Sequence, residues 1–191
     1  MSNRPDWLLD HTHDMPLETV AKSLARINRF SGRTPKPYSV AKHSVVVMHL
    51  LPRDASFEAR RLALAHDWHE IYVGDVCRPA KQCFGAALRE LTDAIDLVMW
   101  DRYKLRPTFE DCQAVDAADN LANRIEVELL GYSGTARVEF ALKQMDLPKG
   151  CKIDAIAKHM TYLTTADRDA NLWLWWWVEI TSDAAIARLA T

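Results

Sequence analysis

The chain has 191 residues with 24 basic and 26 acidic side chains, which gives a formal net charge of −2. Its composition, 49% hydrophobic and 26% charged, is typical of a soluble globular domain and excludes a disordered or collagen-like chain. A net charge this close to zero gives no general basic field, so we expect neither polymeric nucleic acid nor a membrane as a partner.

The length predicts one domain over residues 1–191, with a core at about 17–130 and C-terminal helices at about 151–185. Cysteines at positions 77, 83, 112 and 151 form no Cys-x-x-Cys pair, and no apolar signal segment occurs at the N-terminus. We therefore expect free thiols and a cytoplasmic location. The most apolar run, 172–178, is shorter than the roughly 20 residues that a membrane span needs.

Apolar residues at intervals of three and four predict an all-α fold, a single helical bundle, because no segment alternates for long with period two. A first helix is expected from Pro16 to the Ser31-Gly32 pair, and a second over 39–51. A third, over 58–72, ends at Gly74, and Pro79 is placed in the loop that follows it.

Helices are also expected over 88–102, 112–129, about 153–164 and about 171–180. The tryptophans at 173, 175, 176 and 177 do not share one helical face, so we expect at least part of this cluster to be buried between helices or subunits. The protein is expected to form a homo-oligomer.

Charge is distributed unevenly near the N-terminus. From Thr19 to Arg53 there are seven basic residues and no acidic one. The segment is either a solvated helix face or a surface that receives phosphate, since guanidinium and ammonium groups match phosphate oxygens.

Within the third predicted helix, the segment 65–70 places two imidazoles and two carboxylates among aliphatic residues. Burial of these groups without partners would be costly. His66 and Asp67 can reach one ion beside the helix, while Glu70 overlooks it. His43 and Asp119 are the candidate ligands from other helices, with Asp116 as the alternative to Asp119. Two imidazoles and two carboxylates suit Mn, Co, Zn or Fe better than Ca²⁺.

The order H…HD…D resembles the HD superfamily of metal-dependent phosphohydrolases. The Ile27-Asn28-Arg29 segment, the pattern from His66 to Asp75, and the later Ala118-Asp119 pair are similar to the bacterial 5′-deoxynucleotidases and the phage deoxynucleotide triphosphohydrolases, including dATP-specific ones. The resemblance covers most of residues 17–130.

The resemblance implies a metal site of four ligands: His43, His66, Asp67 and Asp119. It implies Glu70, Asp75 and Arg29 as catalytic residues, and Arg29 and Lys81 as substrate-binding residues. Phe30 is also expected to bind substrate, but it departs from the family, because the 5′-deoxynucleotidases carry at this position a tryptophan that helps to select the deoxyribose. The implied activity is cleavage of the 5′ ester at the α-phosphate, which gives deoxynucleoside plus phosphate or triphosphate; additional Mg²⁺ would accompany a triphosphate. The partner would be a small-molecule nucleotide.

Other interpretations remain open. The protein could hydrolyse a cyclic or alarmone-type nucleotide, or be a non-catalytic metal-stabilised helical binding protein. Arg78 is either a surface charge or a phosphate contact, and His69 is given no chemical role. The His11, His13 and Asp14 group is interpreted as a helix start with Asp14 as N-cap rather than as a metal site.

Overall fold

The structure is a computed structural model that describes residues 15–162 and 165–189, with side chains described as far as 182. The segment with His11, His13 and Asp14 lies outside the described residues. The all-α prediction is confirmed: the described residues form helices and no strand, apart from an isolated bridge between Asn28 and Ser39. The elements in chain order are α2 (Leu17–Arg26), the 3₁₀ helix η1 (Arg29–Gly32), α3 (Val40–Leu50), α4 (Phe57–Ala65), α5 (Glu70–Val73), α6 (Arg78–Arg102), α7 (Phe109–Leu129), α8 (Thr135–Leu142), α9 (Ile153–Thr161) and α10 (Ala166–Leu189).

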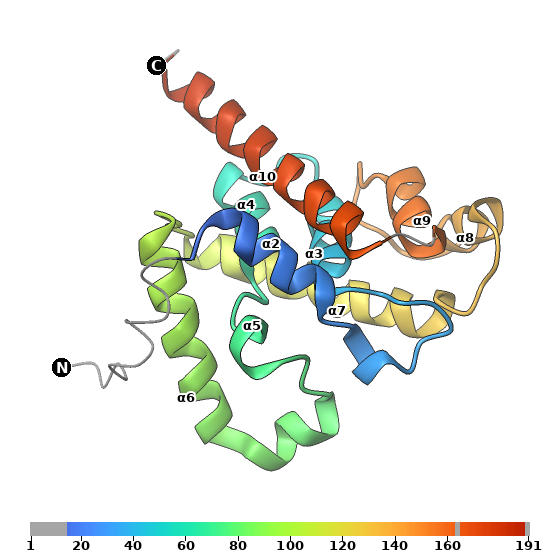
Figure 1. Ribbon diagram of the computed structural model, residues 1–191. Coiled ribbons are helices and arrows are strands. Elements are labelled where there is room, and N and C mark those ends of the chain that lie inside the picture. The colour runs from blue at the N-terminus through green and yellow to red at the C-terminus, as the bar shows by residue number, and fades with distance from the viewer. Residues whose placement is uncertain (1–14, 163–164, 190–191) are drawn as a thin grey trace.

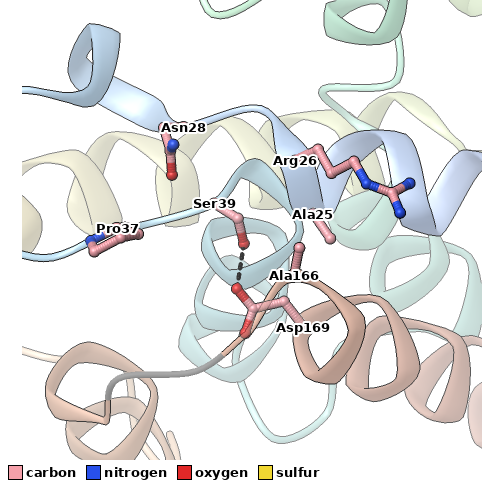
Figure 2. A pocket seen from close by; sticks show the side chains of 7 residues that line it. All are labelled: Ala25, Arg26, Asn28, Pro37, Ser39, Ala166 and Asp169. Atoms are coloured by element: carbon pink, nitrogen blue, oxygen red, sulfur yellow. Dashed lines mark hydrogen bonds between the residues drawn. The ribbon is translucent and has the colours of Figure 1, made fainter.

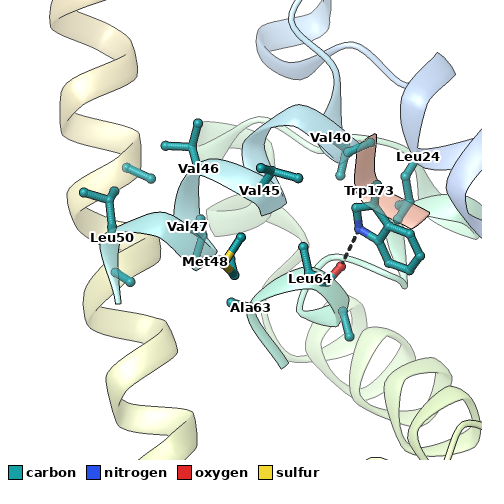
Figure 3. Close-up of a cluster of buried hydrophobic side chains, with 14 of the residues drawn as sticks. Leu24, Val40, Val45, Val46, Val47, Met48, Leu50, Ala63, Leu64 and Trp173 are labelled. Carbon is teal, nitrogen blue, oxygen red and sulfur yellow. Dashed lines mark hydrogen bonds between the residues drawn. The ribbon is translucent and has the colours of Figure 1, made fainter. Parts of the chain in front are cut away.

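Helix α3 is the centre of the bundle, packed against α2, α4, α7, α9 and α10 (Figure 1). All its residues are buried, including the polar side chains of Lys42, His43, Ser44 and His49. Val45, Val46 and Leu50 point into the core shown in Figure 3. Ser39 begins the helix, because its side chain accepts a hydrogen bond from the amide of Lys42 at 3.1 Å. His43 is thereby carried into the middle of the molecule.

The third predicted helix is not continuous, which corrects the sequence prediction. Helix α4 ends at Ala65 and α5 begins at Glu70, with a tight turn over 66–69 between them. In this turn the amides of Trp68 and Glu70 donate to carbonyls three residues earlier, at 3.0 Å each, rather than four. The tighter winding brings Trp68 fully into the core, where its ring lies 5.2 Å from that of Trp177.

Helix α6 begins ten residues earlier than the sequence predicts, at Arg78 rather than residue 88, and Pro79 lies in its first turn rather than in a loop. At Gly85 the backbone adopts φ 58° and ψ −129°, a conformation that is open only to glycine, and the helix bends there. Helix α8 was not predicted, because only Val138 and Leu142 of its eight residues are buried and the apolar pattern is correspondingly weak.

The C-terminal tryptophans divide between core and surface. Trp173 and Trp177 are buried and stacked at 5.4 Å, and the indole nitrogen of Trp173 donates to the carbonyl of Leu64 at 2.9 Å (Figure 3). Trp175 is 51% exposed. Helix α10 is thereby joined to the end of α4. Within residues 15–162 and 165–189, no helix combines the length and the apolar composition that a bilayer-spanning segment needs.

The buried His49 and the partly buried His159 couple the stability of the fold to pH. The rings of His49 and His159 stack at 5.5 Å, and Trp176 packs edge-on against His49. Burial and the neighbouring histidine lower the pKa of His49 to about 3, and burial together with Lys42 lowers the pKa of His159 to about 4. Both rings are therefore neutral in the folded protein at neutral pH.

Because these pKa values lie below the unfolded value of 6.5, the unfolded chain binds more protons as the pH falls. The free energy of unfolding should decrease below about pH 6.5, by up to about 1.4 kcal/mol per pH unit for each histidine. His49→Gln should reduce this slope. Urea unfolding of the parent and of His49→Gln from pH 5 to 8 measures how the free energy of unfolding changes with pH. Identical slopes in the two proteins would show that His49 does not cause this pH dependence.

Candidate metal centre

Four side chains converge where α3, α7 and the turn after α4 meet: His43, His66, Asp67 and Asp119. His43 Nε2 lies 2.9 Å from Asp119 Oδ1 and 3.7 Å from Asp67 Oδ2. His66 Nε2 lies 3.3 Å from Asp67 Oδ2 and 3.7 Å from Asp119 Oδ1. Ligand atoms about 2.1 Å from one ion lie roughly 3.0 to 3.4 Å apart in octahedral or tetrahedral geometry. Ligand atoms of His43, His66 and Asp67 all lie within 4.8 Å of one another, so these three residues could hold one ion, and Asp119 Oδ1 stands beside both imidazoles.

Both imidazoles present the correct nitrogen. His43 Nδ1 bonds Glu126 Oε1 at 2.6 Å, and His66 Nδ1 donates to the carbonyl of Ala63 at 2.9 Å. A carbonyl oxygen can only accept, so the proton of a neutral His66 lies on Nδ1 and the lone pair on Nε2. Both Nε2 atoms are buried and, among the described residues, neither is aligned for a hydrogen bond, although carboxylate oxygens of Asp67 and Asp119 lie 2.9 to 3.7 Å away. The free electron pairs of these two nitrogen atoms lie next to carboxylate oxygens. Together they form a group of ligand atoms that could hold a metal ion.

The charge of the cluster also favours a cation. Burial opposes charge on His66, but Asp67 and Asp119 raise its pKa well above the usual value. The two imidazoles in turn lower the pKa of Asp119, against the effect of burial. If both imidazoles are neutral, the site carries three negative charges, on Asp67, Asp119 and Glu126. The guanidinium of Arg29 compensates one of them, so two negative charges remain. A divalent ion would neutralise both charges.

Asp119 rather than Asp116 faces the imidazoles. Asp119 is partly buried, whereas Asp116, one turn earlier on α7, is exposed. Asn123 stands one turn after Asp119 and donates to its Oδ1 at 3.0 Å, which fixes the carboxylate orientation. Asn123 is not among the site residues that the sequence predicts.

Glu126 is the most important residue that the sequence analysis missed. It is fully buried, and its Oε1 accepts from the hydroxyl of Tyr38 at 2.9 Å as well as bonding His43. Its Oε2 accepts from Arg29 Nε at 3.2 Å. One carboxylate thus orients a candidate metal ligand and a candidate substrate-binding residue. One feature of the sequence could have identified Glu126 as a site residue: it lies seven residues, or two helical turns, after Asp119 and within the apolar stripe of α7.

Arg29 lies directly beside the candidate ligands. Nη1 donates to Asp67 Oδ2 at 3.4 Å and Nη2 donates to Asn123 Oδ1 at 2.5 Å. Burial opposes its charge, but Glu126 and Asp67 raise its pKa above the usual value. With the bond from Nε to Glu126, three of its five N–H groups are used, which leaves two for a ligand.

Glu70 begins α5 and is 1% exposed. Neither carboxyl oxygen has a hydrogen-bond partner among the described residues. Burial, Asp67 and Asp75 raise the pKa of Glu70 to about 9, so its carboxyl group carries a proton at neutral pH. Lys81 Nζ lies 3.9 Å from Glu70 Oε1.

The other predicted site residues surround this group. Phe30 and Ser31 adopt left-handed backbone conformations, and the guanidinium of Arg29 lies 5.6 Å from the centre of the Phe30 ring. The amide of Ser31 donates to Asp75 Oδ2 at 3.4 Å, which joins η1 to the loop after α5. His69, to which the sequence assigns no role, bonds Asp96 through Nδ1 at 2.9 Å.

The basic segment 19–53 does not form one phosphate-receiving surface. Lys22 pairs with Glu18, and Lys42 donates to the carbonyl of Tyr162 at 3.3 Å. Lys36 donates to the carbonyl of Thr161. Of the basic residues in this segment, Arg29 is the one placed beside the candidate ligands.

A cavity of about 220 Å³ lies between the end of α2, the segment before α3 and the first turn of α10 (Figure 2). Ser39 Oγ donates there to Asp169 Oδ2 at 2.7 Å. None of the predicted site residues lines this cavity. A larger cavity, of about 410 Å³, lies between α5 and α6 and includes His69 and Lys81 in its lining.

No protein-family model matches the chain. Over 142 residues it is 34% identical to an uncharacterized protein of Rhodobacter capsulatus, RCAP_rcc00048, and the match covers 70% of this chain and 72% of that protein. Over 94 residues it is 35% identical to the uncharacterized protein YfdR of Escherichia coli K12, with 49% and 50% of the two chains covered.

Proposed function

We propose that the chain, which belongs to the same family as the Rhodobacter capsulatus protein RCAP_rcc00048, is a metal-dependent phosphohydrolase that cleaves the 5′ ester of a deoxynucleotide. The observation that carries the proposal is the convergence of His43, His66, Asp67 and Asp119 on one point beside Arg29 and Glu70. A purely structural metal site needs its ligands alone and would give no reason for the two further groups. The H…HD…D resemblance supports the same activity.

The buried, unpartnered Nε2 atoms of His43 and His66, together with the carboxylates of Asp67 and Asp119, fit Mn²⁺, Co²⁺, Zn²⁺ or Fe²⁺. Such an ion would lower the pKa of a water molecule towards neutrality and screen charge on a phosphoryl oxygen. The protein contributes the positions of the ligands and a site largely closed to solvent, in which charged groups interact more strongly than in water.

Arg29 is proposed to bind the α-phosphate. Its two remaining N–H groups can donate to phosphate oxygens, while Glu126 and Asn123 hold its plane in place. Lys81 would add a second positive charge from α6. Phe30 would pack against the substrate, with its ring held close to Arg29.

Glu70 is proposed to act as the general acid. Its protonated carboxyl group can donate to the 5′ oxygen as the bond from that oxygen to phosphorus breaks, so that the deoxynucleoside leaves neutral. Asp75, which η1 holds through the amide of Ser31, would orient the sugar or a water molecule.

The direct test is release of phosphate or triphosphate from all four deoxynucleoside mono- and triphosphates, with Mn²⁺ or Co²⁺ added. We expect turnover with at least one of them and loss of turnover with a chelator. A protein that retains metal but hydrolyses none of them would instead support the non-catalytic, metal-stabilised interpretation.

Glu126→Gln should weaken metal binding by about 10- to 100-fold, because an amide cannot accept from both His43 and Arg29 as a carboxylate does. Competition with a fluorescent chelator measures the affinity. The matched control is Glu128→Gln, an exposed position on the same helix. Equal metal affinity in the two variants would show that Glu126 does not position His43 for metal binding.

A further inference from the structure

Asp96, on α6, holds a residue beside the candidate metal centre that the proposed function leaves without a role. Its Oδ1 accepts from the backbone amide of His69 at 3.2 Å, and its Oδ2 bonds the ring Nδ1 of the same residue at 2.9 Å. A carboxylate accepts hydrogen bonds and does not donate them, so Nδ1 carries a proton. One side chain of α6 therefore fixes both the backbone and the ring of His69.

The support comes from the part of α6 that is anchored in the core. Asp96 lies among the buried residues of this helix, which are Ile95, Val98 and Met99. The side chains of Asp96 and His69 are 16% and 13% exposed, so both bonds are largely shielded from water. A hydrogen bond in such surroundings is stronger than one at the surface. The pair can therefore hold the turn over 66–69 in one position.

The residue that Asp96 holds lies between two site residues. Asp67 precedes His69 by two residues, and Glu70 follows it directly as the first residue of α5. A ring nitrogen of His69 lies within 4.8 Å of a carboxyl oxygen of each. Helix α5 contains four residues, which is too few to fix its own direction. The direction of the Glu70 side chain therefore depends on the backbone at His69.

Glu70 depends on this support more than Asp67 does. Asp67 Oδ2 also accepts from Arg29 Nη1 at 3.4 Å, which holds that carboxylate from a second direction. The carboxyl oxygens of Glu70 have no hydrogen-bond partner within the described part of the chain, although the residue is 1% exposed. Loss of the bonds from Asp96 should therefore displace Glu70 and leave the candidate metal ligands in place.

We propose that Asp96 and His69 are positioning residues for Glu70, and that they act by fixing the backbone from which its side chain extends. The inference rests on the proposed function, in which Glu70 is the general acid. In this role neither Asp96 nor His69 needs to contact the substrate or the ion. A displacement of a catalytic group by about 1 Å can reduce the rate by about 100-fold, so the position of this backbone affects turnover.

Asp96→Asn should lower kcat for deoxynucleotide hydrolysis by about 10- to 100-fold, with KM and metal content close to those of the parent. The oxygen of the new amide can accept but its nitrogen cannot, so one of the two bonds to His69 is lost. His69→Ala should have the same effect. His69→Asn should retain most of the parent's kcat, because its side-chain amide can still donate to Asp96. Asp93→Asn, the same change at an exposed position one turn earlier on α6, is the control, and circular dichroism checks that each variant folds.

A second measurement reports the position of Glu70 without turnover. In protein loaded with Co²⁺, the isotope-labelled carboxyl carbon of Glu70 has a paramagnetic shift that depends on its distance and direction from the ion. Loss of this signal in Glu70→Gln assigns it. We expect the shift to change in Asp96→Asn and His69→Ala, and to stay at the parent value in His69→Asn and Asp93→Asn.

If the parent hydrolyses deoxynucleotides and Asp96→Asn keeps both the kcat and the shift of the parent, the activity stands and the positioning role is wrong. Loss of metal from His69→Asn also overturns this role, because it would make His69 a ligand. If the parent hydrolyses no deoxynucleotide but the shift of Glu70 still depends on Asp96, the positioning of Glu70 stands and the proposed function fails.

Discussion

Glu70→Gln should reduce turnover by about 100- to 10,000-fold while the protein retains its metal ion. The amide keeps the volume of the side chain but has no acidic proton to give to the leaving oxygen. Since neither Glu70 oxygen has a hydrogen-bond partner among the described residues, the substitution breaks no such bond of the fold. Single-turnover kinetics and metal analysis by emission spectroscopy, carried out on the same sample, separate the two effects.

Glu128→Gln, on the exposed face of α7, should leave both metal content and turnover unchanged. If Glu70→Gln has the turnover of the parent, Glu70 is not the general acid. If it loses the metal ion, Glu70 is a ligand instead.

Asp119→Asn should remove both metal and activity. The carboxylate lies 2.9 Å from His43 Nε2 and supplies one of the two charges that would balance a divalent ion, and an amide supplies neither the charge nor the same affinity. We expect metal affinity to fall by more than about 100-fold, beyond the 10- to 100-fold that is typical for residues that only support a ligand. Metal retained after dialysis against a weak chelator measures the loss.

The chain offers a close control for this substitution. Asp116→Asn makes the same chemical change one helical turn earlier, at an exposed position. It should retain metal and turnover. If Asp116→Asn and Asp119→Asn lose metal equally, the choice of Asp119 as ligand is wrong.

The sequence predicted the helices that carry strong apolar periodicity, such as α7, because burial of one face leaves a regular pattern. It failed where tertiary packing overrides that pattern. The segment 66–69 is helical by composition, yet it forms a tighter turn that places Trp68 fully in the core. Gly85 and Pro79 are ordinary loop signals, but both lie within α6.

The candidate site was predictable to the extent that its residues are rare among apolar neighbours. His43, His66, Asp67 and Asp119 stand out in this way, and the structure brings them together. Glu126 did not, since a single acidic residue in a long helix more often faces solvent than the core. Its role depends on Tyr38 and Arg29, which lie 88 and 97 residues away in the chain and which no local pattern connects to it.

The bond from the Trp173 indole to the Leu64 carbonyl limits how far the protein can be shortened. Leu64 lies two residues before His66, so the last helix supports the stretch of backbone that displays two candidate ligands. A fragment trimmed to residues 17–130 would contain every candidate ligand but lack this hydrogen bond, and shortened or fused versions of the protein should therefore retain α10.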